Sequence, residues 1–192
     1  MSRAHGFLTP LVVVLGLVAP AGASTTRAAA RNPADFTGVL LRGPGAAAVP
    51  LTLHVDSFTS AREVGRLSRL LGDRAPRRVA AALAAIRPRG WVEVGGLVDC
   101  EVPVIREFAT DRGPRIFAVL DNPSPLWDRL HLTRPPDAPF GLLELRLSLD
   151  GNGRGTLVGA GRALFTKDGK AEIVSYGSRP HPIIGVAQQP AG

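Results

Sequence analysis

The sequence is poor in cysteine and in aromatic residues. Cys100 is the single cysteine among 192 residues, so no internal disulfide can form and packing must hold the fold. Asp99 and Glu101 flank this thiol with negative charge, which disfavours a reactive thiolate. Aromatic residues make up 5% of the chain, and none lies among the arginines of residues 60–89. Because single-stranded nucleic acid is bound largely by stacking on aromatic side chains, no nucleic-acid partner is expected.

Long apolar runs are also missing. The longest, residues 7–19, is shorter than the roughly 20 residues of a membrane-spanning helix, so no transmembrane segment is expected. Arg3 precedes this run and small residues follow it, which is the pattern of a secretory signal peptide over residues 1–23. We expect cleavage after Ala23, with Ala30 as a second candidate position and an uncleaved anchor as the alternative. The mature protein is therefore predicted to be secreted or periplasmic.

Turn-forming residues are frequent in the chain. The 22 glycines and 17 prolines follow no three-residue period, which excludes a collagen-like protein. Residues 24–34 lack apolar periodicity and are predicted to be a flexible lead-in. A single domain is expected over residues 35–186, followed by a Pro/Gly-rich tail at residues 187–192.

Alternating apolar residues predict strands over residues 35–41 and 51–56. In the second strand, Thr52, His54 and Asp56 share one face, and aliphatic residues occupy the other. This half-apolar pattern is typical of a sheet with one face on the core.

A change of apolar period to 3.6 predicts a helical hairpin over residues 60–87. Ser60 and Glu63 have the spacing of a capping box, so the first helix begins there. Gly72 is expected to end this helix, and Pro76 suits the first turn of the second.

After Gly90 the sequence is typical of β-structure. A loop with one helical turn near residues 126–130 interrupts it, and further strands are predicted over residues 91–94, 102–108, 115–120, 143–149 and 171–176. Asn152 and Gly153 form the preferred dipeptide of a two-residue type I′ turn, which would place Leu149 opposite Thr156.

Together these patterns predict an α+β fold of seven or eight strands in mostly antiparallel order. The helical hairpin is inserted between the second and third strands. We expect a strongly curved sheet or a small barrel, with a flat sheet carrying both helices on one face as the alternative.

Three short motifs carry a resemblance to a known group of proteins. They are Phe36-Thr-Gly, residues 51–56 running into Ser60-x-x-Glu63, and Asp150-Gly-Asn-Gly-x-Gly155. This set resembles a family of uncharacterised secreted bacterial proteins, described only as a domain of unknown function. The resemblance spans about residues 36–186. It implies a single exported domain and carries over no catalytic residue.

Candidate chemistry is confined to His54 and Asp56, two positions apart on one strand face. Such a carboxylate would orient the imidazole for acid–base chemistry. The alternative is that this face is solvated, or packs under the helical hairpin. The sequence contains no nucleophile elbow, no P-loop and no dinucleotide-binding motif.

No metal site and no cofactor are predicted. The three histidines of the mature chain have no second histidine or cysteine at ligand spacing: His54, His131 and His181. The segment beginning at Asp150 matches the first half of a calcium loop, but Arg154 and Gly161 stand where an oxygen ligand and a glutamate are needed.

Positive charge is concentrated in residues 60–89, which hold eight arginines and two acidic residues in a chain of net charge +7. In the first predicted helix, Arg62, Arg66 and Arg69 lie on the side opposite the apolar stripe. With Arg77 and Arg78 they are predicted to contact an anionic lipid surface or an acidic polymer. The alternative is a solvated helix face in a chain that uses 21 arginines and 2 lysines.

These observations predict a non-enzymatic envelope or secreted module that binds an anionic or small apolar ligand. The alternative is a secreted hydrolase or isomerase that uses His54 and Asp56.

Overall fold

The computed structural model describes residues 33–43, 48–71, 76–121, 124–130, 140–159, 161–165, 171–176 and 179–190. The predicted signal peptide, most of the predicted lead-in and Gly72 lie outside the described residues. The strands are β1 (Ala34–Leu41), β2 (Ala48–Val55), β3 (Gly90–Val94), β4 (Leu97–Glu101), β5 (Val104–Thr110), β6 (Gly113–Asp121), β7 (Phe140–Leu147), β8 (Asn152–Val158), β9 (Gly161–Phe165), β10 (Ala171–Tyr176) and β11 (His181–Pro190). The helices are α1 (Ala61–Leu71), α2 (Pro76–Ala84) and α3 (Ser124–Leu130).

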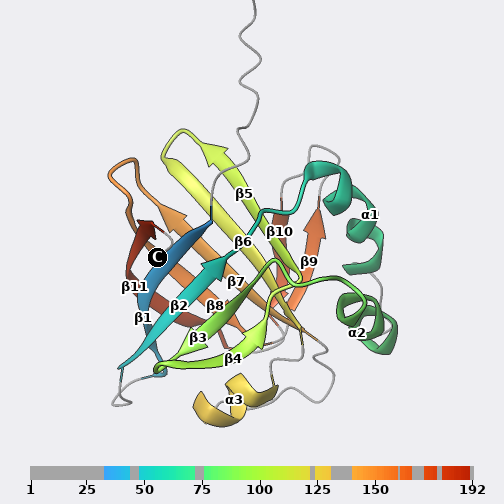
Figure 1. The fold of residues 1–192 in the computed structure, drawn as a ribbon, viewed down its shortest axis with the longest axis horizontal. Helices are drawn as coiled ribbons and strands as arrows, with labels where there is room; N and C mark the ends of the chain where they lie inside the picture. The colour runs from blue at the N-terminus through green and yellow to red at the C-terminus, as the bar shows by residue number, and fades with distance from the viewer. Residues whose placement is uncertain are drawn as a thin grey trace, which may run out of the picture.

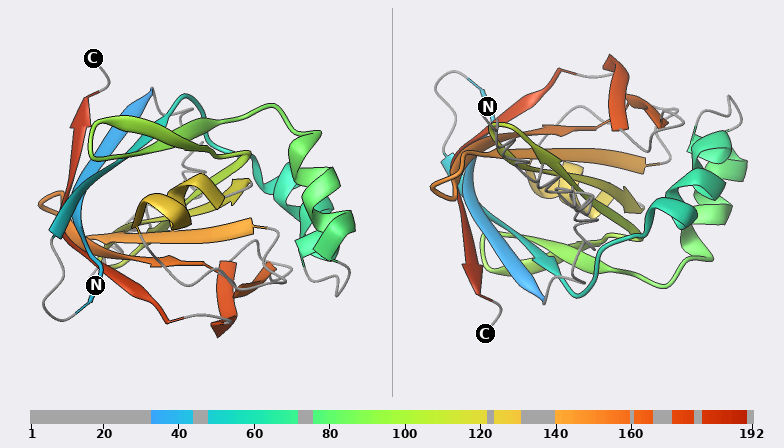
Figure 2. Two further views of the ribbon diagram at one scale, coloured as in Figure 1. Left: turned by 90° about the horizontal axis from the view of Figure 1, so that it is seen from below. Right: turned by 90° about the horizontal axis from the view of Figure 1, so that it is seen from above.

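Nine strands form one antiparallel sheet in the order β4-β3-β2-β1-β11-β8-β7-β6-β5, and β9 pairs with β10. The sheet curls into a half-barrel, which Figures 1 and 2 show from three directions. Its two edge strands, β4 and β5, are consecutive in the chain and are separated by Val102 and Pro103. The thiol of Cys100 in β4 donates to the backbone oxygen of Asp121 at the end of β6, 2.8 Å away. The buried Cys100 thus ties one edge strand to β6.

The inside of the half-barrel is an apolar core. Inward-facing side chains such as Leu53, Ile116 and Leu143 are fully buried in it. α3 lies across one end of the half-barrel (Figure 1, lower edge) and adds the buried side chains of Leu126 and Trp127. Burying each such large side chain contributes about 1.5–3 kcal/mol, so this core dominates the stability of the fold.

A second apolar cluster lies on the outer face of the sheet, under the helical hairpin. Val64 of α1 and Leu83 of α2 pack in this cluster with Phe117 of β6 and Leu142 of β7. β6 is therefore buried on both faces, which explains why residues 116–120 are all apolar rather than alternating. The capping box is confirmed, because Ser60 N donates to Glu63 Oε2 at 2.8 Å and Glu63 N donates to Ser60 Oγ at 3.3 Å.

The predicted architecture is confirmed in part. The antiparallel curved sheet and the inserted helical hairpin are present, as are the strand at β10 and the helical turn at α3. The predicted α+β label and the count of seven or eight strands are only approximate, because the described chain is mostly β and its main sheet has nine strands. A strongly curved sheet or a small barrel was expected, and the sheet curls into a half-barrel (Figure 1).

Two strands differ from the prediction near the edges of the sheet. β4 was not predicted, and the strand expected over residues 102–108 begins two residues later, as β5, because Val102 and Pro103 separate the two strands. Thr59 covers the open side of β5, since its backbone N donates to Ile105 O at 2.6 Å and its Oγ1 accepts from Ile105 N at 3.0 Å. Proline at this point suits a break between strands, because it has no N–H to donate to a ladder.

The predicted tail is also wrong, because β11 continues to Pro190 and pairs with β1 and β8. Its alternation is hidden in the sequence by a bulge. The register shifts between Ile183 and Val186, both of which are buried, and Gly185 has a φ of +61° within the bulge. Residues 187–190 therefore belong to the domain.

The β7–β8 hairpin is present, but its tip lies earlier than predicted. Gly151 N donates to Ser148 O at 3.0 Å, and Gly151 has a φ of +83°. This arrangement is the three-residue hairpin loop that ends in a left-handed residue, in place of a two-residue turn at residues 152–153. The register consequently places Leu147 opposite Gly153, and Leu149 lies in the loop.

Candidate functional site

Three arginines stand in one row across the outer face of the sheet. Arg115 of β6 lies opposite Arg146 of β7, which lies opposite Arg154 of β8. The neighbouring Ile116 and Leu145 belong to the interior core, so alternation directs the arginines outward. Like charges directly opposite each other destabilise a sheet. A negative charge close to the row would therefore relieve this repulsion.

Glu144 supplies one negative charge to the row. It is 6% exposed, and its Oε1 accepts hydrogen bonds from Nε of Arg115 and from Nε of Arg146, the second at 2.8 Å. Two guanidiniums are thus held at one carboxylate oxygen. Phe108 of β5 extends the row, because the guanidinium carbons of Arg106 and Arg115 lie 5.6 and 5.8 Å from its ring centre. Among the described residues of this face, four arginines therefore stand beside one carboxylate.

The arginine row borders an open cavity of about 560 Å³, which we call the arginine cavity. Its volume lies within the roughly 300–1,000 Å³ that is usual for ligand pockets. It opens between the β5–β6 turn and the β7–β8 loop, and its lining residues are Thr110, Arg112, Gly113, Pro114, Arg115, Arg146, Leu147, Ser148, Asn152, Gly153 and Arg154.

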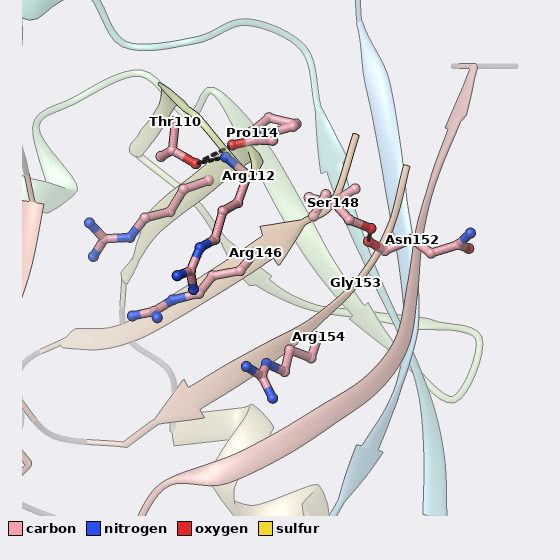
Figure 3. Close-up of a pocket in the computed structure, with 11 residues that line it drawn as sticks. Thr110, Arg112, Pro114, Arg146, Ser148, Asn152, Gly153 and Arg154 are labelled. Carbon is pink, nitrogen blue, oxygen red and sulfur yellow. Dashed lines mark hydrogen bonds between the residues drawn. The ribbon is translucent and has the colours of Figure 1, made fainter. Parts of the chain in front are cut away.

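A fourth arginine, Arg112, reaches the cavity from the β5–β6 turn. Figure 3 shows the side chains of Arg112, Arg146 and Arg154 extending into the same space. Thr110 holds the turn, because its hydroxyl donates to Gly113 O at 2.7 Å and accepts from Arg112 N at 3.3 Å. Within the part of the chain that the structure describes, neither Arg112 nor Arg154 forms an ion pair. Both guanidiniums are available to an anion.

The β7–β8 loop adds polar groups beside these cations. Hydrogen bonds from the Ser148 hydroxyl and then from the backbone of Asn152 lower the pKa of Asp150. The Asn152 N donates to Asp150 Oδ1 at 3.1 Å. The Asp150 carboxylate is thus held by its own loop and does not line the cavity. In the described residues, no group of three or more His, Cys, Asp or Glu side chains is placed to hold a metal ion.

His54 lies elsewhere on the sheet, and its imidazole contacts carboxylates that are distant in the sequence. Its Nδ1 lies 2.9 Å from Asp35 Oδ1, and its Nε2 lies 3.4 Å from Glu93 Oε2. Its ring stacks on Trp91 with centroids 4.6 Å apart. Asp56 is exposed beyond the end of β2. The carboxylate partner expected from sequence is therefore wrong, and the imidazole joins β1, β2 and β3.

Three of the five predicted helical arginines have side chains that the structure describes. Arg62 and Arg66 of α1 and Arg78 of α2 are exposed, whereas the side chains of Arg69 and Arg77 lie outside the described residues. Glu63 reduces the positive charge of α1. Hydrogen bonds from the side chain and the backbone of Ser60, together with the nearby charges of Arg89 and Arg66, lower its pKa, and Arg89 forms an ion pair with it. None of the helices in the described ranges has the length and apolarity to cross a membrane.

The arginine cavity was not predicted because its arginines come from two separate hairpins, β5–β6 and β7–β8. Arg112 and Arg115 belong to one hairpin, and Arg146 and Arg154 to another. The alternation of β7 placed Glu144 and Arg146 on its polar face, which was an available signal. The error in the hairpin tip concealed that Arg154 would face Arg146.

No family model, curated protein or solved structure matches this chain. The resemblance to a family of uncharacterised secreted bacterial proteins stays a prediction. Export and cleavage after Ala23 also stay predictions, because residues 1–32 lie outside the described residues.

Proposed function

We propose that this protein is an exported, non-enzymatic module that binds an anionic ligand in the arginine cavity. The observation that carries the proposal is the cross-strand row of Arg115, Arg146 and Arg154, with Arg112 on the adjoining turn. Glu144 bonds two of these four cations. An anionic ligand would supply the remaining negative charge.

The geometry of guanidinium groups supports this proposal. Arginine presents a planar fork of donors that matches a carboxylate or a phosphate in a bidentate arrangement. Glu144 fixes Arg115 and Arg146 through their Nε atoms, so these two side chains lose less freedom when a ligand binds. A concave site also concentrates the positive field. It therefore attracts anions more strongly than an isolated arginine on a flat surface does.

The two other predicted binding surfaces have weaker support. Arg62, Arg66 and Arg78 are exposed on the helices, as Arg112, Arg146 and Arg154 are on the sheet. The hollow beside α1, however, is lined by only Arg66 of these three helical arginines and by the ion pair of Glu63 with Arg89. The half-barrel interior, which a small apolar ligand would need, contains packed side chains such as Leu53 and Leu143. We therefore favour the anionic ligand over the apolar one, and the cavity over the helices.

Calorimetric titration with inorganic tripolyphosphate at low salt tests the proposal. The wild-type protein should bind this probe, and binding should weaken as salt rises because the contacts are ionic. Arg112→Gln with Arg154→Gln should reduce affinity by about 100-fold, since each lost charge-assisted contact costs about 1.4 kcal/mol, or tenfold.

Arg62→Gln with Arg78→Gln is the matched control, because it removes the same formal charge from the helices. This control should bind tripolyphosphate as the wild type does. The opposite pattern, with binding lost in the helical variant and kept in the cavity variant, would move the site to the helical hairpin. No binding by the wild-type protein would reject the proposed function.

A further inference from the structure

A smaller hollow of different chemistry adjoins the arginine cavity. It has a volume of about 260 Å³ and is lined by Glu144, Arg146, Arg154, Gly155 and Thr156. Arg146 and Arg154 line both spaces. Along β7 and β8, away from their connecting loop, the surface thus changes from arginines to a carboxylate and a hydroxyl.

The register of the sheet sets the spacing between these two surfaces. Glu144 lies directly opposite Thr156, as Arg146 lies opposite Arg154. Successive residues of one face are two positions apart, or about 7 Å along an antiparallel strand. Facing side chains of one row have Cβ atoms about 4.5–5.5 Å apart. The outer face therefore presents a cationic pair and, beside it, a pair made of a carboxylate and a hydroxyl.

The second pair suits hydroxyl groups of a ligand. A carboxylate accepts hydrogen bonds at about four lone-pair positions, and the two described bonds of Glu144 both use Oε1. Glu144 would repel a second anionic group and accept from an O–H donor. The Thr156 hydroxyl both donates and accepts. A ligand that fits both spaces would carry an anionic group at one end and hydroxyls at the other.

We infer that the ligand is an acidic saccharide, whose carboxylate binds in the arginine cavity and whose ring hydroxyls bind at Glu144 and Thr156. This inference rests on the proposed function and specifies its ligand class. A hexuronate ring carries its carboxylate and its C2 and C3 hydroxyls at opposite sides. Its carboxylate can therefore lie in the arginine cavity while these hydroxyls reach the smaller hollow farther along β7 and β8.

Three probes of three units each separate the contributions of charge and of hydroxyls. Trigalacturonate carries three carboxylates and ring hydroxyls, capped tri-L-glutamate carries three carboxylates and no hydroxyl, and maltotriose carries hydroxyls and no carboxylate. Trigalacturonate should bind about tenfold more tightly than capped triglutamate, as expected for one or two added hydrogen bonds. Maltotriose should bind more weakly than either acid. Equal affinities of the two acids would overturn the inference.

Thr156→Val tests the hydroxyl contact without touching the arginines, because valine has nearly the same shape and suits a strand. It should weaken trigalacturonate binding by about fivefold and leave triglutamate binding unchanged. Thr156→Ser keeps the hydroxyl and should restore the wild-type preference. If Thr156→Val leaves trigalacturonate affinity unchanged, the inference is wrong. The proposed function would still stand if the wild-type protein binds tripolyphosphate. If no anionic probe binds, both are wrong.

Discussion

Arg146 of β7 and Arg154 of β8 lie directly opposite each other on the outer face of the half-barrel. This juxtaposition depends on the loop between the two strands. Because Gly151 adopts a φ of +83°, three residues close the hairpin and the following strand starts in a register that aligns the two arginines. A different loop length would rotate Arg154 away from Arg146.

Close approach of the two strands predicts a steric effect at Gly153. A Cβ atom at this position would lie 2.1 Å from Arg146 O and 2.9 Å from Leu147 Cα, both backbone atoms. Gly153→Ala should therefore destabilise the protein by about 1–3 kcal/mol, as forced repacking does, and should weaken tripolyphosphate binding. Urea unfolding measures the first effect and calorimetry the second.

Gly65→Ala provides the control for that substitution. A Cβ atom at Gly65 would meet nothing within 4 Å, and the residue lies inside α1. Alanine there should stabilise the protein by about 0.5–1 kcal/mol, because glycine loses more backbone entropy in a helix. Equal stability of the Gly153 variant and the wild type would contradict the close packing of β7 on β8.

Glu144 is expected to stabilise the arginine row in the absence of ligand. Glu144→Ala removes the carboxylate that binds Arg115 and Arg146, which leaves like charges facing each other in a partly buried place. We expect a loss of about 2–3 kcal/mol in unfolding free energy. Glu101→Ala, at an exposed position of β4, should change stability by less than about 0.5 kcal/mol. Similar losses in both variants would show that the Glu144 contacts contribute little.

The capping box makes the stability of α1 depend on pH. The pKa of Glu63 lies below its ordinary value of 4.5, mainly because of hydrogen bonds from Ser60. A lowered carboxyl pKa adds stability above pH 4.5, and that stability is lost as the pH falls through the folded-state pKa. Ser60→Ala should cost about 1 kcal/mol at neutral pH. The difference from wild type should shrink below about pH 4 in chemical unfolding. A difference that stays constant down to about pH 3 would contradict this role of Glu63.

Export remains to be tested on the full chain. Expression in a bacterial host followed by N-terminal sequencing of the exported fraction should give Ser24 as the first residue, because Ala21 and Ala23 form the small-x-small end of a signal peptide. Material that still begins at Met1 would support an uncleaved anchor instead.

Local signals in the sequence predicted the elements that local physics determines. The Ser60 and Glu63 spacing identified the start of α1, because a capping box involves residues within one helical turn. The alternation in β2 correctly placed Leu53 inside and His54 outside. Such features need no knowledge of the partner strands.

Features that depend on strand pairing were missed. The partner of His54 is Asp35, which is 19 residues away and was brought close by the β1–β2 register. β11 was not predicted as a strand, and its residues 187–190 were assigned to a tail, because Pro182 and the bulge at Gly185 break its alternation. Predicting the arginine cavity required both the register within the β5–β6 and β7–β8 hairpins and the pairing of β6 with β7.

The most direct test of the account observes the arginine side chains while tripolyphosphate is added. In nitrogen-15 NMR spectra, the Nε–H signals of Arg112, Arg115, Arg146 and Arg154 can be assigned by single Arg→Lys substitutions. The account predicts that these four signals shift together and saturate, whereas those of Arg62, Arg66 and Arg78 stay in place. Shifts confined to the helical arginines, or shifts of similar size at every arginine, would contradict an anion site in the arginine cavity.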